Sequence, residues 1–347
     1  MAVGFPTKVT YANGDVFSAS DINDTNGTIN LLTSSTLSLQ GGKNCAINGG
    51  FDIWQRGTSS SGNAYIADRW YSALISGTGT FAQETTVIQS GGLYAMKFTA
   101  SATAQPALYQ AVEQLNTIPY AGKTVTVSGL VAASTSVPMT IDVQHSSTAN
   151  TGVTGSWTSI TATLGGTATP TSTTFVSISG VYAIPSTAKS LRIRVFTTST
   201  IASSVVVYFS NIQLELGSTA TTFSRAGGTI QGELAACQRY YYQLGYLDIA
   251  QVYASSTTTS TCIIRFPVQM RTAPTGISVG TVGDWRLYNQ IAGFGTPTSI
   301  VFNNGYTTGT LFTITTGAGS PTLVAGYSGF LYGVNSAAII QFTGAEL

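Results

Sequence analysis

Apolar and polar positions alternate over short stretches of the chain, and this pattern predicts β-strands. The stretches carry Val, Ile, Phe or Tyr at every second position or as short buried runs, and they cover residues 125–128, 140–143, 191–196, 204–209, 261–266 and 311–314. Turns between these stretches are predicted by residue pairs that tolerate a positive φ, at Asn13-Gly14, Gly165-Gly166 and Asn304-Gly305. We therefore expect an all-β protein of antiparallel sandwiches.

Two segments favour helix instead. Residues 18–21 offer an N-cap and an acidic first turn, and Ile22, Ile29 and Leu32 follow at the spacing of a weak heptad seam. This apolar side either joins other copies of the chain or packs on its own sandwich, and the pattern favours neither. A second helix is expected within residues 232–242, after a Gly-rich hinge at Gly227-Gly228 and before an aromatic strand.

These breaks divide the chain into three parts. We expect residues 1–42 to form an N-terminal segment with a short helix, residues 43–226 a first β-sandwich, and residues 227–347 a second, C-terminal β-sandwich domain. A length of 347 residues suits two domains and an appendage.

Composition excludes several classes of protein. The chain is 43% hydrophobic and only 8% charged, with a net charge of +1, so a nucleic-acid partner is not expected. Its apolar runs are broken before the ~18 residues that a spanning helix needs, so membrane insertion is not expected either. The first residues do not resemble a secretory signal, which predicts synthesis in the cytoplasm. Cys45, Cys237 and Cys262 lack metal-ligand spacing and are expected to be free thiols.

Few residues could carry catalysis. Because His145 is the single histidine of the sequence, most nucleophilic triads and metal sites built from several histidines are excluded. Glycan hydrolysis needs only two carboxylates, and Asp52 and Asp68 are the most distinctive acids, but each fits a structural role better. We therefore expect no catalytic residue and no cofactor. The spacing of the acids predicts no metal site, and Ca²⁺ held by loop carbonyls with one or two of these acids stays open.

The remaining class of function is binding, carried by aromatic and polar side chains on a rigid β scaffold. Sugars present C–H faces to flat rings and hydroxyls to polar partners. The candidates for a glycan contact are Trp157, in a turn-rich polar stretch, and Trp285, Arg286 and Tyr288, in a loop-like stretch. A position in the core or at a subunit interface is the alternative for each large aromatic.

Several ordered motifs resemble one protein family. They are NCAINGGFDIWQRG at residues 44–57, YIADRWY at 65–71, NIQLELGSTATTF at 211–223, ELAACQRYYY at 233–242, FPVQMRTAP at 266–274 and the terminal AEL. Together they resemble the tail-fibre and receptor-binding proteins of tailed bacteriophages. The opening, residues 8–23, is similar to virion-attachment segments.

The resemblance implies a jelly-roll module like a carbohydrate-binding domain, then a distal β domain, usually in a homotrimer. It implies a location in the virion, attachment to other tail or baseplate proteins through the N-terminus, and binding of host cell-surface polysaccharide. Trp54 and Trp70 match motif positions that we assign to packing, and Arg56 and Asp68 complete this structural motif.

Two other functions stay open at this point. One is a purely structural virion component, such as a baseplate adaptor or a head decoration, without a receptor role. The other is a polysaccharide depolymerase.

Overall fold

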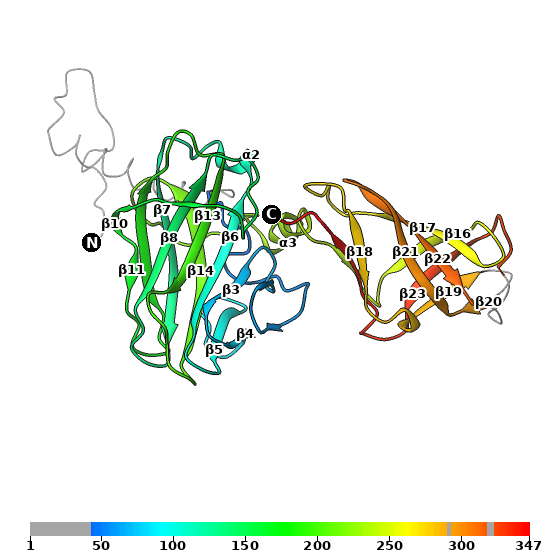
Figure 1. Ribbon diagram of the computed structural model, residues 1–347, viewed down its shortest axis with the longest axis horizontal. Coiled ribbons are helices and arrows are strands. Elements are labelled where there is room, and N and C mark those ends of the chain that lie inside the picture. Colours follow the sequence, from blue (N-terminus) through cyan, green and yellow to red (C-terminus); the bar gives the residue numbers. More distant parts are fainter. Residues whose placement is uncertain (1–42, 290–292, 318–322) are drawn as a thin grey trace, which may run out of the picture.

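The computed structural model describes residues 43–289, 293–317 and 323–347. Two β-rich domains lie at opposite ends of its long axis, and a helix and the C-terminus lie between them (Figure 1). Within the described residues, helical segments occur only at α2 (Gln114–Thr117), α3 (Ile230–Gln238) and η1 (Val282–Asp284). The predicted all-β class is confirmed. The seam residues Ile22, Ile29 and Leu32 lie outside the described residues.

The first domain consists of two antiparallel sheets. The first sheet has the order β1 (Ser59–Ser60), β4 (Gly79–Glu84), β5 (Ala95–Ala100), β14 (Val206–Leu216), β7 (Thr124–Ala133), β12 (Val176–Ala183) and β10 (Ala162–Gly165). The second has the order β11 (Thr167–Ala168), β8 (Met139–Ser146), β13 (Ser190–Thr197), β6 (Gln105–Val112), β3 (Tyr71–Ser76) and β2 (Ala64–Tyr65), with β9 (Thr158–Ser159) also paired to β8.

These sheets are connected as a jelly roll, as expected. The long strands from β5 onward alternate between the sheets, so that β14 lies between β5 and β7 and β13 lies between β6 and β8. The side chains between the sheets form one apolar core, in which the Phe81 and Phe98 rings lie 4.7 Å apart. Burial of each such side chain stabilises the fold by about 1.5–3 kcal/mol.

The second domain packs a large sheet on a small one. The large sheet has the order β20 (Gly293–Gly295), β19 (Trp285–Asn289), β23 (Ser328–Gly333), β16 (Ile249–Ala254), β17 (Thr259–Arg265), β22 (Gly309–Thr316) and β21 (Pro297–Tyr306). The small sheet has the order β15 (Gln243–Leu244), β24 (Ile340–Thr343) and β18 (Gly276–Val279). Its Leu244 and Phe342 share a core with Val252 and Phe312 of the large sheet.

The connection between the domains is tightly packed. Thr229 caps α3 through a hydrogen bond from the Gly232 backbone N–H. A Cβ on Gly227 would lie 2.1 Å from the Gly232 carbonyl carbon, so glycine permits a close approach here where a hinge was predicted. The predicted aromatic strand starts later than expected, because Tyr240–Tyr242 are irregular and β15 begins at Gln243.

Two of the three turn predictions had opposite outcomes, and the third, Asn13-Gly14, lies outside the described residues. Gly165 and Gly166 end β10 with φ of 67° and 96°, as the pair predicts. Asn304-Gly305 is not a turn, because both residues lie inside β21. A Cβ on Gly305 would lie 2.2 Å from the Pro274 carbonyl oxygen, so this glycine serves a close backbone approach.

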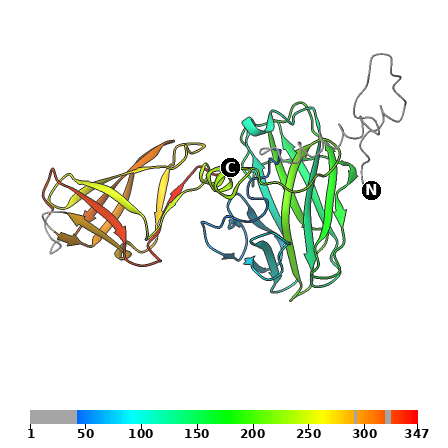
Figure 2. The same cartoon turned by 180° about the vertical axis from the view of Figure 1, so that it is seen from behind.

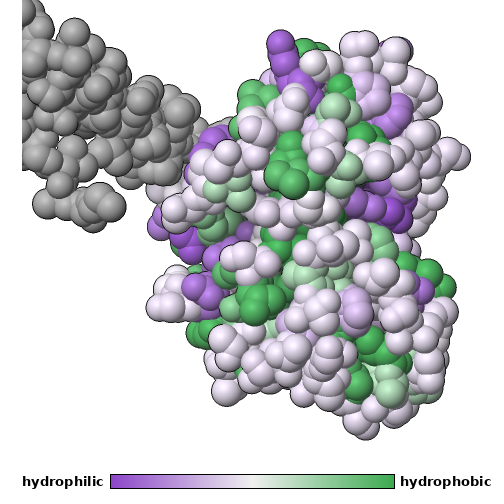
Figure 3. Space-filling model, turned by 90° about the vertical axis from the view of Figure 1, so that its left-hand side faces the viewer, coloured by the Kyte–Doolittle hydropathy of each residue, from purple (hydrophilic) through white to green (hydrophobic). Residues whose placement is uncertain are grey.

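The surface reflects the low charge of the chain. The view from behind shows the same separation of the two domains (Figure 2). The end of the jelly roll turned away from the second domain carries mainly weakly polar side chains, with hydrophobic ones scattered among them (Figure 3). Across the part of the chain that the structure describes, no helix has the length and hydropathy to cross a membrane.

Candidate functional site

The outer face of the large sheet in the second domain carries a row of exposed and half-buried side chains. Strand register places Phe294 opposite Tyr288, Tyr288 opposite Phe330, Phe330 opposite Gln251, and Gln251 opposite Ile263. The exposed fractions of Phe294 and Phe330 are 61% and 45%. We call this row and its neighbours on β16, β17 and β23 the distal face.

One end of the distal face is aromatic. The Tyr288 ring lies 5.0 Å from Phe294 and stacks with Phe330 at 6.5 Å, and Phe294 meets Tyr332 edge-on at 6.3 Å. With Ile249, these rings line an open hollow of about 500 Å³. Exposed apolar side chains that gather in this way make this end of the distal face a candidate binding surface.

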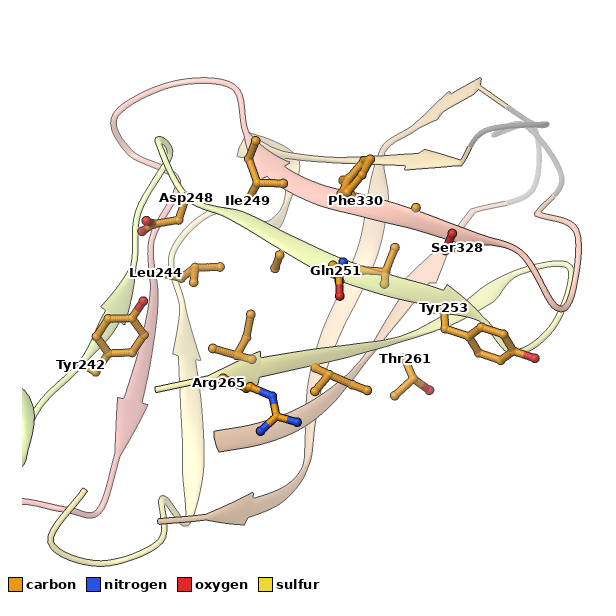
Figure 4. A pocket seen from close by; sticks show the side chains of 15 residues that line it. Tyr242, Leu244, Asp248, Ile249, Gln251, Tyr253, Thr261, Arg265, Ser328 and Phe330 are labelled. Carbon is orange, nitrogen blue, oxygen red and sulfur yellow. The ribbon is translucent and has the colours of Figure 1, made fainter. Parts of the chain in front are cut away.

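The other end of the distal face adds polar groups. An adjoining hollow of about 640 Å³ shares Ile249 and Phe330 and also contains Gln251, Arg265 and Asp248. In Figure 4 these side chains come from β16, β17, β23 and the loop before β16 and surround one opening. The distal face thus combines ring surfaces with hydrogen-bonding groups, the combination that suits a sugar chain.

The structure corrects the role expected for Trp285. Its side chain is 0% exposed and belongs to the core of the second domain, so it does not contact a surface glycan. The segment expected to be loop-like is strand β19, in which Trp285 and Leu287 point inward and Arg286 and Tyr288 outward. The alternative of a core position was therefore right for Trp285.

The two outward residues of β19, Arg286 and Tyr288, differ in whether their side chains are free to contact a ligand. Tyr288 belongs to the aromatic end described above. Arg286 is turned back on its own chain, where its Nη1 donates to the carbonyls of Gly283 and Trp285, each at 2.8 Å.

Trp157 lies far along the chain from these residues, in the jelly roll. It is half-buried, and its Nε1 donates to the Gly152 carbonyl at 3.1 Å. Its ring lies 5.2 Å from the Arg192 guanidinium carbon. The structure therefore does not bring Trp157 together with Tyr288.

Sequence reasoning missed Ile249, Gln251, Phe294 and Phe330. Strand β16 offered a signal, because apolar residues occupy both of its faces: Ala250 and Val252 are buried while Ile249 and Tyr253 are exposed. Two apolar residues on the solvent side of one strand indicate a contact surface when neighbouring strands add further exposed apolar residues.

The residues of the structural motif gather where the two domains meet. Trp70 is 0% exposed, packs on Phe51 at 5.4 Å and donates to the Asn48 carbonyl at 2.9 Å. Trp54 is half-buried and donates to the Phe51 carbonyl. Both indoles thus fix the loop that begins the jelly roll.

The last three residues, 345–347, return from the second domain and attach to the first. The Glu346 carboxylate accepts hydrogen bonds from Arg56 and Arg69, and the Leu347 carbonyl accepts one from the Tyr65 hydroxyl. Arg271 donates to the Ala345 and Glu346 carbonyls at 2.8 and 2.9 Å. We call residues 345–347 and these four partners the C-terminal clasp.

Tyrosines of the ELAACQRYYY motif complete the clasp. The Arg69 guanidinium lies 3.6 Å from the centre of the Tyr240 ring, and that of Arg56 lies 3.6 Å from the centre of Tyr241. Burial alone would lower the pKa of Arg69, but the Glu346 carboxylate raises it above its usual range. Arg69 therefore keeps its charge although it is buried.

Asp68 contacts the C-terminal clasp through Arg56. It is 0% exposed, accepts a hydrogen bond from Gln55, and its Oδ1 lies 3.5 Å from Arg56 Nε. Burial raises the pKa of Asp68 to about 7, against the opposing effect of Arg56. A carboxyl group this deeply buried is not in reach of a substrate.

The described residues offer little for metal or thiol chemistry. Nowhere among them do three His, Cys, Asp or Glu side chains gather as a metal site. Cys45, Cys237 and Cys262 are free, and burial raises the pKa of each thiol, to about 12 for Cys45. The thiols therefore stay protonated and act as packing groups.

No protein-family model matches the chain, and no curated protein matches it. Among solved structures, a putative sugar binding protein from Bacteroides thetaiotaomicron is similar with a TM-score of 0.34 and 11% identity, over 50% of this chain and 100% of the other. A family 22 carbohydrate binding module of Clostridium thermocellum has a TM-score of 0.36 and 13% identity, over 52% and 99%. Similarities this low transfer no function to the chain.

Proposed function

We propose that this chain is a structural virion protein of a tailed bacteriophage, a tail fibre or receptor-binding protein that binds host surface glycan through its distal face. Residues 1–42 attach it to other tail or baseplate proteins, the jelly roll is the shoulder, and the second domain points towards the host. The chains act as a homo-oligomer, for which we propose a trimer.

The observation that carries the proposal is the distal face itself. It presents the stacked Tyr288 and Phe330 rings beside Gln251 and Arg265 on a rigid sheet. A shallow site of this kind binds a single sugar chain weakly, and the several copies of an oligomer supply the avidity.

Binding without turnover agrees with the placement of the acids. Asp52 is 8% exposed and pairs with Arg225 at 2.7 Å, and Asp68 is buried under the clasp. Neither carboxyl group lines the two hollows of the distal face, and each is taken up by an arginine, which does not favour the two-carboxylate chemistry of a glycosidase.

The binding proposal is tested with purified full-length protein on an array of bacterial surface glycans and on host cells. We expect Tyr288→Ala to weaken glycan binding and cell adsorption about tenfold, because each ring contact contributes about 1 kcal/mol or more. Tyr306→Ala is the matched control, since Tyr306 is 51% exposed but does not line either hollow. Equal adsorption by the two variants would contradict the proposal.

A purely structural role is the second candidate, because the end of the distal face around Phe294 is almost wholly apolar and also fits a protein partner. A cryo-EM map of the particle separates the two functions. A receptor-binding protein has its second domain at a free tip, whereas a structural component has the distal face covered. Deletion of residues 1–42 should leave a folded protein that no longer joins particles.

A further inference from the structure

The jelly roll has a second surface of chemical interest, on the outer face of the sheet formed by β2, β3, β6, β13 and β8. Register places Tyr65, Tyr71, Tyr109, Arg194 and Asp142 in one row across these five strands. Tyr65 and Tyr71 meet edge-on at 5.4 Å. Every member of the row is half-buried, so each keeps one side towards solvent.

A neighbouring row contains Arg192, and this arginine is held between two aromatic rings. Its guanidinium carbon lies 4.7 Å from the centre of Tyr109 and 5.2 Å from Trp157. Trp157 is fixed above the sheet by its bond to the Gly152 carbonyl and by the pairing of β9 with β8. Arg192 and its two rings therefore form a preorganised platform.

The charges on this platform are unbalanced. Arg194 has an acidic partner, because its Nε and Nη2 both donate to the Asp142 carboxylate. The partners of Arg192 are neutral, namely the Gln144 amide oxygen and the Val153 carbonyl. Burial lowers the pKa of Arg192 to about 10, and nearby Arg194 adds to this effect. Asp142 therefore pairs with Arg194, and Arg192 has only neutral hydrogen-bond partners among the described residues.

A ligand that carries a negative charge would neutralise Arg192, and an apolar surface on the same ligand would pack on the neighbouring rings. A carboxylate can accept from the Arg192 N–H groups that Gln144 and Val153 do not take, and the C–H face of a sugar ring matches the solvent side of a tyrosine or tryptophan ring. We propose that this face of the jelly roll binds an acidic saccharide, with the sugar carboxylate at Arg192 and the sugar ring against Tyr109 and Trp157. The clasp residue Leu347, which packs in the same cluster as Tyr109 and Trp157, closes one end of the site.

This site shares no residue with the distal face, so either proposal can fail without the other. The full-length protein is titrated calorimetrically with oligogalacturonate and, separately, with the same oligomer as its methyl ester, which masks the carboxylates. Sialyllactose and lactose form a second acidic and neutral pair. We expect each acid to bind at least about tenfold more tightly than its neutral partner and this preference to shrink as salt is raised.

Arg192→Gln should abolish the preference for the acid and leave the ester unaffected. Lys189→Gln is the matched control, because it removes the same charge from an exposed position just before β13. Unchanged binding of the ester by Arg192→Gln shows that this variant is folded, and Trp157→Phe should retain the preference for the acid with weaker affinity. Equal binding of acid and ester, equal effects of Arg192→Gln and Lys189→Gln, or no binding of either acid at millimolar concentration would overturn the proposal. Tyr288→Ala should not alter this binding.

Discussion

The charge on Glu346 should determine how firmly the two domains are joined. Its carboxylate pairs with Arg56 and Arg69, and the Arg69 side chain is only 1% exposed. Arg69 also donates to the Ala111 carbonyl at 2.6 Å, which fixes it in the jelly roll. The substitution Glu346→Gln keeps the shape and one acceptor oxygen but leaves the guanidinium of Arg69 without its counter-charge.

The expected cost follows from the burial of the pair. Loss of one partner from a buried ion pair costs about 3–5 kcal/mol. Glu346 is 16% exposed and glutamine still accepts a hydrogen bond, so we expect the lower limit of about 3 kcal/mol. For a domain of this size, about 1 kcal/mol corresponds to a shift in Tm of roughly 2–4 °C, which gives a fall of roughly 6–12 °C.

Differential scanning calorimetry measures the shift, and small-angle X-ray scattering measures the mean distance between the domains. Asp284→Asn is the control, because Asp284 is a half-buried acid of the second domain whose described side-chain partner is the neutral Asn335 amide. The reasoning is refuted if Glu346→Gln lowers Tm no more than Asp284→Asn and the scattering curve stays the same.

Three further changes test other parts of the fold. Asp68→Asn should flatten the pH dependence of the free energy of unfolding. Because the pKa of Asp68 is raised in the folded state, that state keeps a proton between about pH 4 and 7 that the unfolded state has lost. Wild-type stability therefore falls as pH rises through this window and is level above it, which urea titrations at several pH values would show. Trp285→Ala should cost about 3–5 kcal/mol in the same titration, because it empties a core position, whereas a surface ligand contact would cost little stability. Gly49→Ala should reduce the yield of folded protein, because the new Cβ would lie 1.9 Å from the Ile212 carbonyl oxygen; a normal yield and thermal melt would contradict this.

The strands of the jelly roll could be predicted because their residues alternate with a period of two. Residues 191–196 show this well, since Leu191, Ile193 and Val195 are buried and Arg192 and Arg194 face outward. The same period is present in β19, but Gly283 and Asp284 before it and the mixed polarity of its side chains suggested a loop. Trp285 was therefore placed on the surface, while its position in the alternation with Leu287 predicts burial.

The candidate sites could be predicted only in part, because they depend on strand register. Tyr288 was identified from its residue type, but its neighbours Phe330 and Phe294 are set by pairing between strands that the sequence does not order. Likewise, Trp157 was identified without Arg192, because β9 brings the tryptophan over a strand that is more than thirty residues away in the sequence.

The recognised motifs have a common physical role that their spacing did not reveal. Arg56, Arg69, Tyr240, Tyr241 and Glu346 come from four separate motifs and meet in the C-terminal clasp. A chain that is only 8% charged concentrates several of its charges in this buried place, where salt screens them weakly. The motifs therefore build the joint between the domains, while Tyr288, Phe330, Trp157 and Arg192, on which the two proposed binding sites depend, lie outside them. It follows that chains sharing these motifs would keep the same joint and could differ freely in the ligands that they bind.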